Sequence, residues 1–169
     1  MAFPVEIHTS NLRVREVVED DFIRFLHMSS DSDVVRYLAF GPTSEAEARG
    51  MIEFAIGSAR ALPRTQYVLA IDDAAEGYLI GSCGLSVSDD APAEAEVYFV
   101  FRKEAWGHGF GGEVLRSLID FAFDNLSLSR VFGKAHPDNQ HSIVTMEGVG
   151  MAYDSVGENS LSDGGTDDG

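Results

Sequence analysis

Three consecutive strand-like segments in the middle of the chain constrain its fold more than any other feature. Residues 65–72 (T-Q-Y-V-L-A-I-D), 78–88 (Y-L-I-G-S-C-G-L-S-V-S) and 95–101 (A-E-V-Y-F-V-F) are rich in β-branched and aromatic residues. The turn-rich stretches D-D-A-A-E-G and S-D-D-A-P-A join them. Connections this short link antiparallel neighbours, because a parallel pair needs a long crossover. The order predicts an antiparallel meander and disfavours the alternating strand–helix units of a doubly wound parallel sheet.

Helical and strand patterns flank the meander on both sides. Residues 12–17 (L-R-V-R-E-V) alternate apolar and polar side chains, as in a half-buried strand. Ser44 and Glu47 have the S-x-x-E spacing of a capping box, and Pro63 ends the helix that starts there. Further helices are predicted over 20–28, 31–38, 113–124 and 139–150, and further strands over 129–136 and from 151. We therefore expect a single α+β domain over residues 1–153 with a mixed, mostly antiparallel sheet.

Composition limits the function classes. The chain has 169 residues, of which 44% are hydrophobic, and this suits one domain with its own core. The single cysteine, Cys83, excludes an internal disulfide and fits a cytoplasmic location. A formal charge of −16 disfavours nucleic acid and membranes as partners and favours cationic molecules. Solubility alone explains this charge equally well.

The glycine loop, residues 105–112 (A-W-G-H-G-F-G-G), lies between the last strand of the meander and a helical pattern. Gly107, Gly109 and Gly112 match G-x-G-x-x-G, which is typical of dinucleotide binding. The stretch R-K-E-A-W separates the strand from Gly107, however, and is too long for the tight turn of the dinucleotide fold. Two interpretations are favoured instead: a loop without a ligand, and a helix start whose N–H groups bind the diphosphate of another molecule.

Together with a second block, the glycine loop resembles the GNAT superfamily of N-acetyltransferases, and within it the RimJ/RimL-type ribosomal-protein acetyltransferases. The acyl-CoA loop of that family reads Q/R-x-x-G-x-G/A. The segment W-G-H-G-F-G matches it at Gly109 and Gly111, with Trp106 in place of the Gln or Arg. The second block, N-x-x-S followed by E-x-x-G-[FM], matches at Asn139, Ser142, Glu147, Gly150 and Met151.

The resemblance implies a three-layer α/β/α fold with acetyl-CoA as co-substrate. Its sheet would splay open beside Val100 and Phe101, and the pantetheine arm would pair with the backbone exposed there. Amides at the start of the following helix would bind the diphosphate. The implied co-substrate-binding residues are Val100, Phe101, Trp106, Gly107, His108, Gly109, Phe110, Gly111, Gly112, Asn139 and Ser142.

The resemblance also implies catalytic groups. The amine must lose a proton and the leaving thiolate must gain one. Glu96 is the expected base, acting through water, and a solvated edge position is its alternative. Ser142, beside Asn139, is the expected acid near the sulfur, and helix capping is the alternative role of this pair. Tyr37 and Phe40 are placed either at the acceptor pocket or in the core.

Other polar residues receive no catalytic role. His136 and His141 match no family position, so structural or surface roles are favoured for them. No Cys/His or carboxylate cluster has the spacing of metal ligands, and we expect no metal.

The sequence therefore predicts an acyl-CoA-dependent N-acyltransferase that transfers an acetyl group directly to a primary amine in a ternary complex. The acidic composition favours a small cationic amine, an aminoglycoside-like compound or a protein N-terminus as acceptor. The alternative is a non-catalytic acyl-CoA-binding protein of the same fold, which acts as a sensor or partner.

The C-terminal end departs from the family pattern. Residues 154–169 (D-S-V-G-E-N-S-L-S-D-G-G-T-D-D-G) are rich in Gly, Ser and Asp, so we expect a disordered acidic tail. The last long strand of the family then has no counterpart, and an edge strand is left uncovered. A homodimer is one way to cover that edge.

Overall fold

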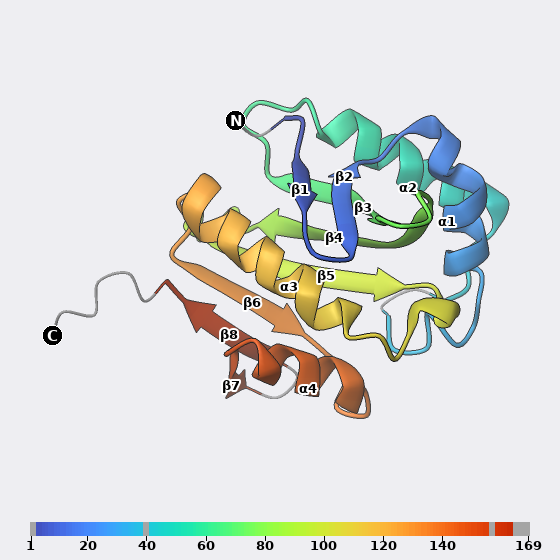
Figure 1. The fold of residues 1–169 in the computed structure, drawn as a ribbon. Coiled ribbons are helices and arrows are strands. Elements are labelled where there is room, and N and C mark those ends of the chain that lie inside the picture. Colours follow the sequence, from blue (N-terminus) through green and yellow to red (C-terminus); the bar gives the residue numbers. More distant parts are fainter. Residues whose placement is uncertain (1–2, 39–40, 156–157, 164–169) are drawn as a thin grey trace, which may run out of the picture.

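The computed structural model of the chain describes residues 3–38, 41–155 and 158–163 (Figure 1). Its strands are β1 (Glu6–His8), β2 (Leu12–Glu16), β3 (Gln66–Asp73), β4 (Leu79–Val87), β5 (Glu94–Phe101), β6 (Arg130–Lys134), β7 (Ala152–Ser155) and β8 (Glu158–Ser162). Its α-helices are α1 (Phe22–Ser29), α2 (Glu45–Ser58), α3 (Phe110–Asp120) and α4 (Gln140–Gly148). The short 3₁₀ helices are η1 (Glu19–Asp21) and η2 (Lys103–Ala105), and the π-helix η3 (Phe121–Asn125) continues α3.

The described strands form one sheet in the order β1-β2-β3-β4-β5-β6-β8-β7. The segment β3-β4-β5 is the predicted antiparallel meander. Only the pair β5–β6 is parallel, and α3 forms the crossover between these two strands. The prediction of a mixed, mostly antiparallel sheet in an α+β fold is confirmed.

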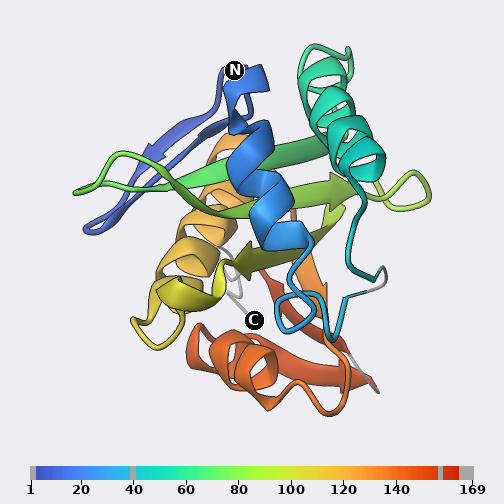
Figure 2. The ribbon, with the colours of Figure 1, turned by 90° about the vertical axis from the view of Figure 1, so that its right-hand side faces the viewer.

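Helices cover both faces of the sheet, which makes three layers (Figure 2). The largest apolar cluster lies under α3, where Val114, Leu115 and Leu118 are fully buried. On the opposite face α1 and α2 pack on each other through Phe22, Ala48 and Ile52. The capping box predicted at the start of α2 is present, because Ser44 Oγ accepts a hydrogen bond from the Glu47 amide and Glu47 Oε1 accepts one from the Ser44 amide.

The sheet opens between β5 and β6. These strands pair at three positions only, and the last pair is Glu96 with Phe132. Beyond it β5 continues to Phe101 beside β4, and β6 continues to Lys134 beside β8. The predicted splay therefore lies beside Val100 and Phe101.

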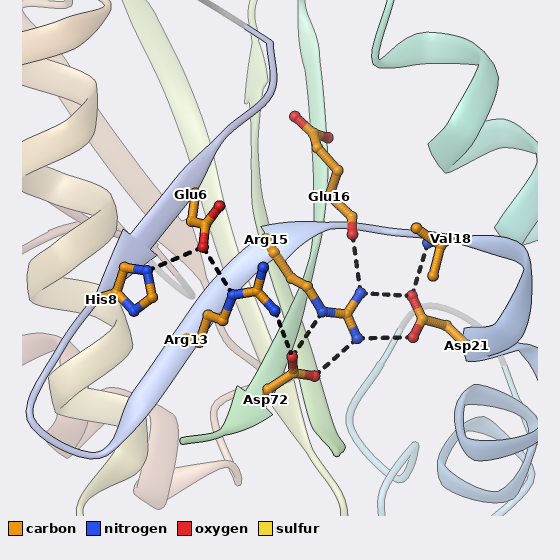
Figure 3. Close-up of polar contacts among 8 residues, drawn as sticks. All are labelled: Glu6, His8, Arg13, Arg15, Glu16, Val18, Asp21 and Asp72. Carbon is orange, nitrogen blue, oxygen red and sulfur yellow. Dashed lines mark hydrogen bonds and ion pairs between the residues drawn. The ribbon is translucent and has the colours of Figure 1, made fainter. Parts of the chain in front are cut away.

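A polar network holds the start of α1 against the sheet (Figure 3). The Arg15 guanidinium on β2 donates two hydrogen bonds to Asp21 of η1, each 2.9 Å long. It also donates to both carboxylate oxygens of Asp72 on β3, at 2.7 and 2.9 Å. Because both carboxylates are buried, Arg15 has to stay in place to compensate their charge.

The structure corrects two sequence predictions. Residues 31–38 form turns instead of a helix, and the Asp31 carboxylate accepts a hydrogen bond from the Asp33 amide at 2.9 Å. The last strand of the sheet is also present: β8 pairs with β6 from Arg130–Ser162 to Lys134–Glu158. The expected disordered tail is therefore wrong for residues 158–162, whereas residues 164–169 lie outside the described part of the chain.

Candidate active site

A cleft of about 590 Å³ opens between the end of β5, the glycine loop and the start of α4. It brings together sequence-predicted residues that are far apart in the chain. These are Tyr37, Val100, Phe101, Trp106, Gly107, Asn139 and Ser142. Phe40, predicted with Tyr37, lies outside the described residues. We call this space the splay cleft.

The β5 backbone forms one wall of the splay cleft. From Val97 to Phe101 its edge away from β4 has no strand partner among the described residues. Such an edge presents N–H and C=O groups to which an extended amide-containing chain can pair. The Trp106 indole N–H donates to the Phe101 carbonyl at 3.0 Å and so closes the far end of this edge. This contact gives Trp106 a structural role at the position where the family pattern has Gln or Arg.

The start of α3 provides a second set of backbone donors. Gly109 has φ +76° and Gly107 has φ +83°, a backbone conformation that glycine adopts without strain. No side chain caps α3 at Gly109 among the described residues. The first amides of the helix therefore point outward at the positive end of its dipole, which is a favourable arrangement for a phosphate group. Gly111 packs so closely that an added Cβ would lie 3.0 Å from the Phe99 ring.

Glu113 is the acidic residue in the first turn of α3, and its carboxylate contacts the β1–β2 turn. It accepts hydrogen bonds from the Asn11 amide and the Asn11 side chain at 2.9 and 2.8 Å, and from the Thr9 hydroxyl. Partial burial opposes ionisation of Glu113, but the Thr9 and Asn11 donors outweigh it and lower its pKa. The carboxylate thus fixes α3 to the β1–β2 turn, and the Thr9 and Asn11 donors compensate its charge.

The start of α4 places Asn139 and Ser142 in the splay cleft. Asn139 Oδ1 accepts a hydrogen bond from the Ser142 amide at 3.3 Å, so Asn139 caps the helix. The Asn139 side-chain NH₂ donates to Ser142 Oγ at 3.0 Å. Because Ser142 Oγ is the acceptor in this contact, its own proton is available to donate into the cleft. Capping and a proton-donating role are therefore compatible in this pair.

Glu96 lies at the base of the splay, at the last β5–β6 pair. It is not part of the described cleft lining, and its Oε1 lies 3.7 Å from Lys134 Nζ. The side chain is 38% exposed, so it is accessible to water. His141 does line the cleft, although it matches no position of the family motif. The His136 ring lies beside the Tyr37 ring, tilted by 31° with ring centroids 5.5 Å apart, and His136 Nδ1 accepts a hydrogen bond from the Asp138 amide.

The rest of the predicted co-substrate set does not line the splay cleft and follows Gly107 along the chain: His108, Gly109, Phe110, Gly111 and Gly112. His108 stacks on Phe110 with ring centroids 5.3 Å apart, and Phe110 packs against Phe101. The side chain of Phe110 therefore belongs to the core edge, and only its backbone belongs to the helix start. Gly111 and Gly112 form the first turn of α3.

The charges that line the splay cleft are positive on balance, in contrast to the whole chain. Among the described residues of its lining, Arg36 and Lys103 are accompanied by a single carboxylate, that of Asp33. Lys103 Nζ lies 2.5 Å from Asp33 Oδ2, and this contact lowers the pKa of Asp33. An excess of cations suits an anionic substrate such as a nucleotide thioester better than a polycation.

A second cavity of about 680 Å³ lies between α1, α2 and the sheet. It shares Val34, Leu38, Phe99 and Val100 with the splay cleft, so the two spaces meet at the end of β5. We call it the apolar cavity, because hydrocarbon side chains make up most of its lining. Sequence reasoning missed it; the only signal was that β5 is apolar on both faces near its end.

The other described parts of the chain provide neither a metal site nor a membrane-spanning helix. No group of three or more His, Cys, Asp or Glu side chains within residues 3–38, 41–155 and 158–163 is placed to hold a metal ion. Over the same ranges no helix is both long and apolar enough to cross a bilayer. Cys83 is fully buried, and burial raises the pKa of its thiol.

Residues 11–152 match the acetyltransferase (GNAT) domain family. The chain belongs to this family. The N-acetyltransferase p20 of Bacillus licheniformis, an uncharacterized protein, is 28% identical over 151 residues, which are 89% of this chain and 84% of that protein. This GNAT protein is thus an acyltransferase, and acyl-CoA-dependent N-acetyltransfer is the activity its family supports.

Solved structures agree with this GNAT fold. Mycobacterium smegmatis RimJ in complex with CoA-disulfide superposes with a TM-score of 0.83 at 13% identity, over 98% of this chain and 91% of that one. Vibrio cholerae spermidine N-acetyltransferase in complex with CoA and spermine gives 0.75 at 17% identity, over 90% and 93%. At these identities the likeness concerns the fold.

Proposed function

We propose that this GNAT protein transfers an acetyl group from acetyl-CoA directly to a primary amine in a ternary complex. One observation carries the proposal. The open β5 edge, the glycine loop and a serine with a proton to donate all line the splay cleft. In this arrangement the β5 edge binds the pantetheine amides and the amides at the start of α3 bind the diphosphate.

The reaction requires that the ammonium lose two protons and that the leaving sulfur gain one. Glu96 first accepts a proton from the ammonium through water, which its exposure and its place at the base of the splay allow. The neutral amine nitrogen then attacks the thioester carbonyl, a C–N bond forms, and the C–S bond breaks as the thiolate leaves. Ser142 Oγ–H, held by Asn139, donates to the departing sulfur, and the second proton lost by the nitrogen restores the Ser142 hydroxyl.

Direct transfer is favoured over an acyl-enzyme intermediate. A cysteine nucleophile must be accessible and largely ionised. Cys83 is the single cysteine of the chain, and it is buried with a raised thiol pKa. The acetyl group therefore passes from sulfur to nitrogen without stopping on this side chain.

The subgroup and setting are finer parts of the same proposal. The motif resemblance and the fold likeness to RimJ both support a RimJ/RimL-type enzyme. The spermidine acetyltransferase supports an amine as acceptor. A cytoplasmic location stays a prediction. A homodimer also stays a prediction, and because β8 covers the edge of β6, an uncovered edge there no longer supports it.

Titration calorimetry with acetyl-CoA, followed by a thiol-release assay against a panel of primary amines, tests the proposal. We expect acetyl-CoA to bind and at least one amine to release CoA thiol with formation of the N-acetyl product. Binding without release on any amine would favour the non-catalytic alternative. A protein that binds no CoA would contradict both functions.

A further inference from the structure

We propose that the acceptor is a primary amine carried on an apolar body, and that this body occupies the apolar cavity between α1, α2 and the sheet. The inference rests on the proposed function and narrows its acceptor class. It narrows the cationic acceptors that the acidic composition favours to amines that carry one ammonium group on an apolar body.

The first argument is the chemistry of the cavity wall. α2 contributes Met51, Ile52 and Ala55, and the sheet contributes Val68 and Leu79. A space of about 680 Å³ lies within the range of small-molecule sites, which are mostly apolar with few orienting polar groups. Hydrocarbon gains free energy in such a space, whereas a charged group loses its hydration.

The second argument is that the polar side chains in the wall already have partners. Asp21 accepts two hydrogen bonds from Arg15 (Figure 3). Ser82 Oγ donates to the Leu69 carbonyl at 2.9 Å. The Ser29 and Thr43 hydroxyls are buried and lie 2.6 Å from each other. A second ammonium deep in the cavity would have to compete for these groups.

Two further polar groups in the wall, Tyr98 and Glu47, do not change this conclusion. The Tyr98 side chain is 37% exposed, and its phenol is neutral at physiological pH because the ordinary pKa of tyrosine is about 10. Glu47 is exposed at the start of α2, where its carboxylate accepts from the Ser44 amide. Because Glu47 is exposed, it can attract a cation from solvent but cannot compensate one inside the cavity.

The third argument is the direction of approach. Trp106, Gly107 and Ser142 line the splay cleft and do not line the apolar cavity. These groups, which are assigned to CoA and to the leaving sulfur, thus lie on the splay-cleft side of Val100, where the two spaces meet. An amine attacks a thioester carbonyl from one face of the carbonyl plane, and an amine in the apolar cavity can reach that carbonyl because the two spaces meet at Val100. This favours the acceptor over a long acyl chain as the occupant.

The test uses alkylamines of increasing length. Butylamine, hexylamine and octylamine are titrated into the protein saturated with CoA, so that binding is measured without turnover. Each added CH₂ is expected to tighten binding about three- to fourfold until the cavity is filled. 1,6-Diaminohexane has the length of hexylamine with a second ammonium, and we expect it to bind at least about tenfold more weakly.

Two variants place the binding in the cavity. Met51→Gln keeps an unbranched side chain on α2, and Val68→Thr keeps the shape of the β3 side chain. Each is expected to weaken hexylamine about fivefold while the Kd of acetyl-CoA stays within about twofold. Ile23→Thr makes a similar change on α1 at a position that is 58% exposed and outside the cavity lining, and it should leave hexylamine affinity unchanged.

The outcomes separate this inference from the proposed function. Equal affinity along the alkylamine series, or tighter binding of the diamine, would overturn the inference. A second result would also overturn it: bound octanoyl-CoA prevents hexylamine from binding, and Met51→Gln weakens the binding of octanoyl-CoA. The cavity would then hold the acyl chain. Hexylamine that binds as expected but releases no thiol from acetyl-CoA would support the assigned ligand class and contradict the proposed transferase activity.

Discussion

The Ser142 hydroxyl is the best-placed proton donor at the scale of single residues. We predict that Ser142→Ala lowers kcat about 100-fold, because the thiolate must leave without a proton donor. The Kd of acetyl-CoA should change little, since Asn139 still caps α4. Stopped-time thiol release and calorimetry measure the two quantities. Ser142→Thr retains a hydroxyl and should recover most of kcat; equal losses in both variants would instead assign Ser142 to packing.

Glu96 is the candidate base, and its removal should change the pH profile. In Glu96→Gln we expect kcat/KM to fall about 100-fold at pH 7. The remaining activity should rise with pH toward the pKa of the free amine, because the acceptor must then lose its proton unaided. Glu94→Gln makes the same neutralisation two residues earlier on β5 and serves as control. Identical profiles for the two variants would remove Glu96 from the reaction.

At the scale of elements, the start of α3 depends on Gly109. Its φ of +76° is costly for an L-residue, so Gly109→Ala should lower the free energy of unfolding by about 1–2 kcal/mol. It should also weaken acetyl-CoA about tenfold, because the first amides of α3 shift from the diphosphate. Gly57→Ala adds a Cβ in open space on α2 and should leave CoA affinity unchanged. Unchanged affinity in Gly109→Ala would contradict the diphosphate site.

The Glu113 contacts that fix α3 to the β1–β2 turn should be sensitive to acid. The folded-state pKa of Glu113 lies below its value in the unfolded chain, where it is about 4.5. Its contribution to stability is therefore present above pH 4.5 and is lost as the pH falls through the folded-state pKa. In urea denaturation, wild type should exceed Glu113→Gln in stability at pH 7, by about 1 kcal/mol or less because the group is partly exposed, and the difference should shrink at pH 3. Glu53→Gln, an exposed carboxylate on α2, provides the control, and a difference that grows on acidification would contradict the assignment.

Most elements are predictable from the sequence because their apolar periodicity or capping residues act locally. The exceptions have physical causes. Residues 31–38 carry a helical pattern, but the Asp31 carboxylate holds the backbone in a turn and Val34 and Val35 are buried instead. The strand β8 has few apolar side chains and resembles a tail. It is stabilised by ladders to two neighbours and by buried Asn159, which sequence periodicity does not reveal.

In the site, too, features that depend on local motifs are predictable from the sequence, and features that depend on tertiary packing are not. The glycine loop and the Asn139–Ser142 block carry local motifs, and the structure brings both to the splay cleft. The apolar cavity depends on how α1 and α2 pack on the sheet, and no short sequence motif predicts the space between these helices and the sheet. The positive charge of the cleft is also hidden, because the formal charge of −16 averages over a chain whose acidic groups lie mostly elsewhere.

At the scale of the whole molecule, β8 connects the sheet to the helix that carries Asn139 and Ser142. It lies between β6 and β7, and α4 contacts both β7 and β8. Ser160 pairs with Phe132 on one side and Ala152 on the other. The Asn159 side chain donates to the Met151 carbonyl at 3.3 Å, which anchors the segment that follows α4. A disturbance in β8 should therefore reach Asn139 and Ser142 through this helix.

Ser160→Pro tests this coupling, because proline in an interior strand removes a ladder hydrogen bond and costs about 3 kcal/mol or more. We expect a lower urea midpoint and, in the fraction that remains folded, weaker acetyl-CoA binding. Ser160→Thr retains the backbone donor and favours strand geometry, so both quantities should stay near wild type. If Ser160→Pro matched wild type in stability, β8 would contribute nothing to the sheet. If it lost stability but bound acetyl-CoA normally, the splay cleft would be independent of the strands beyond β6.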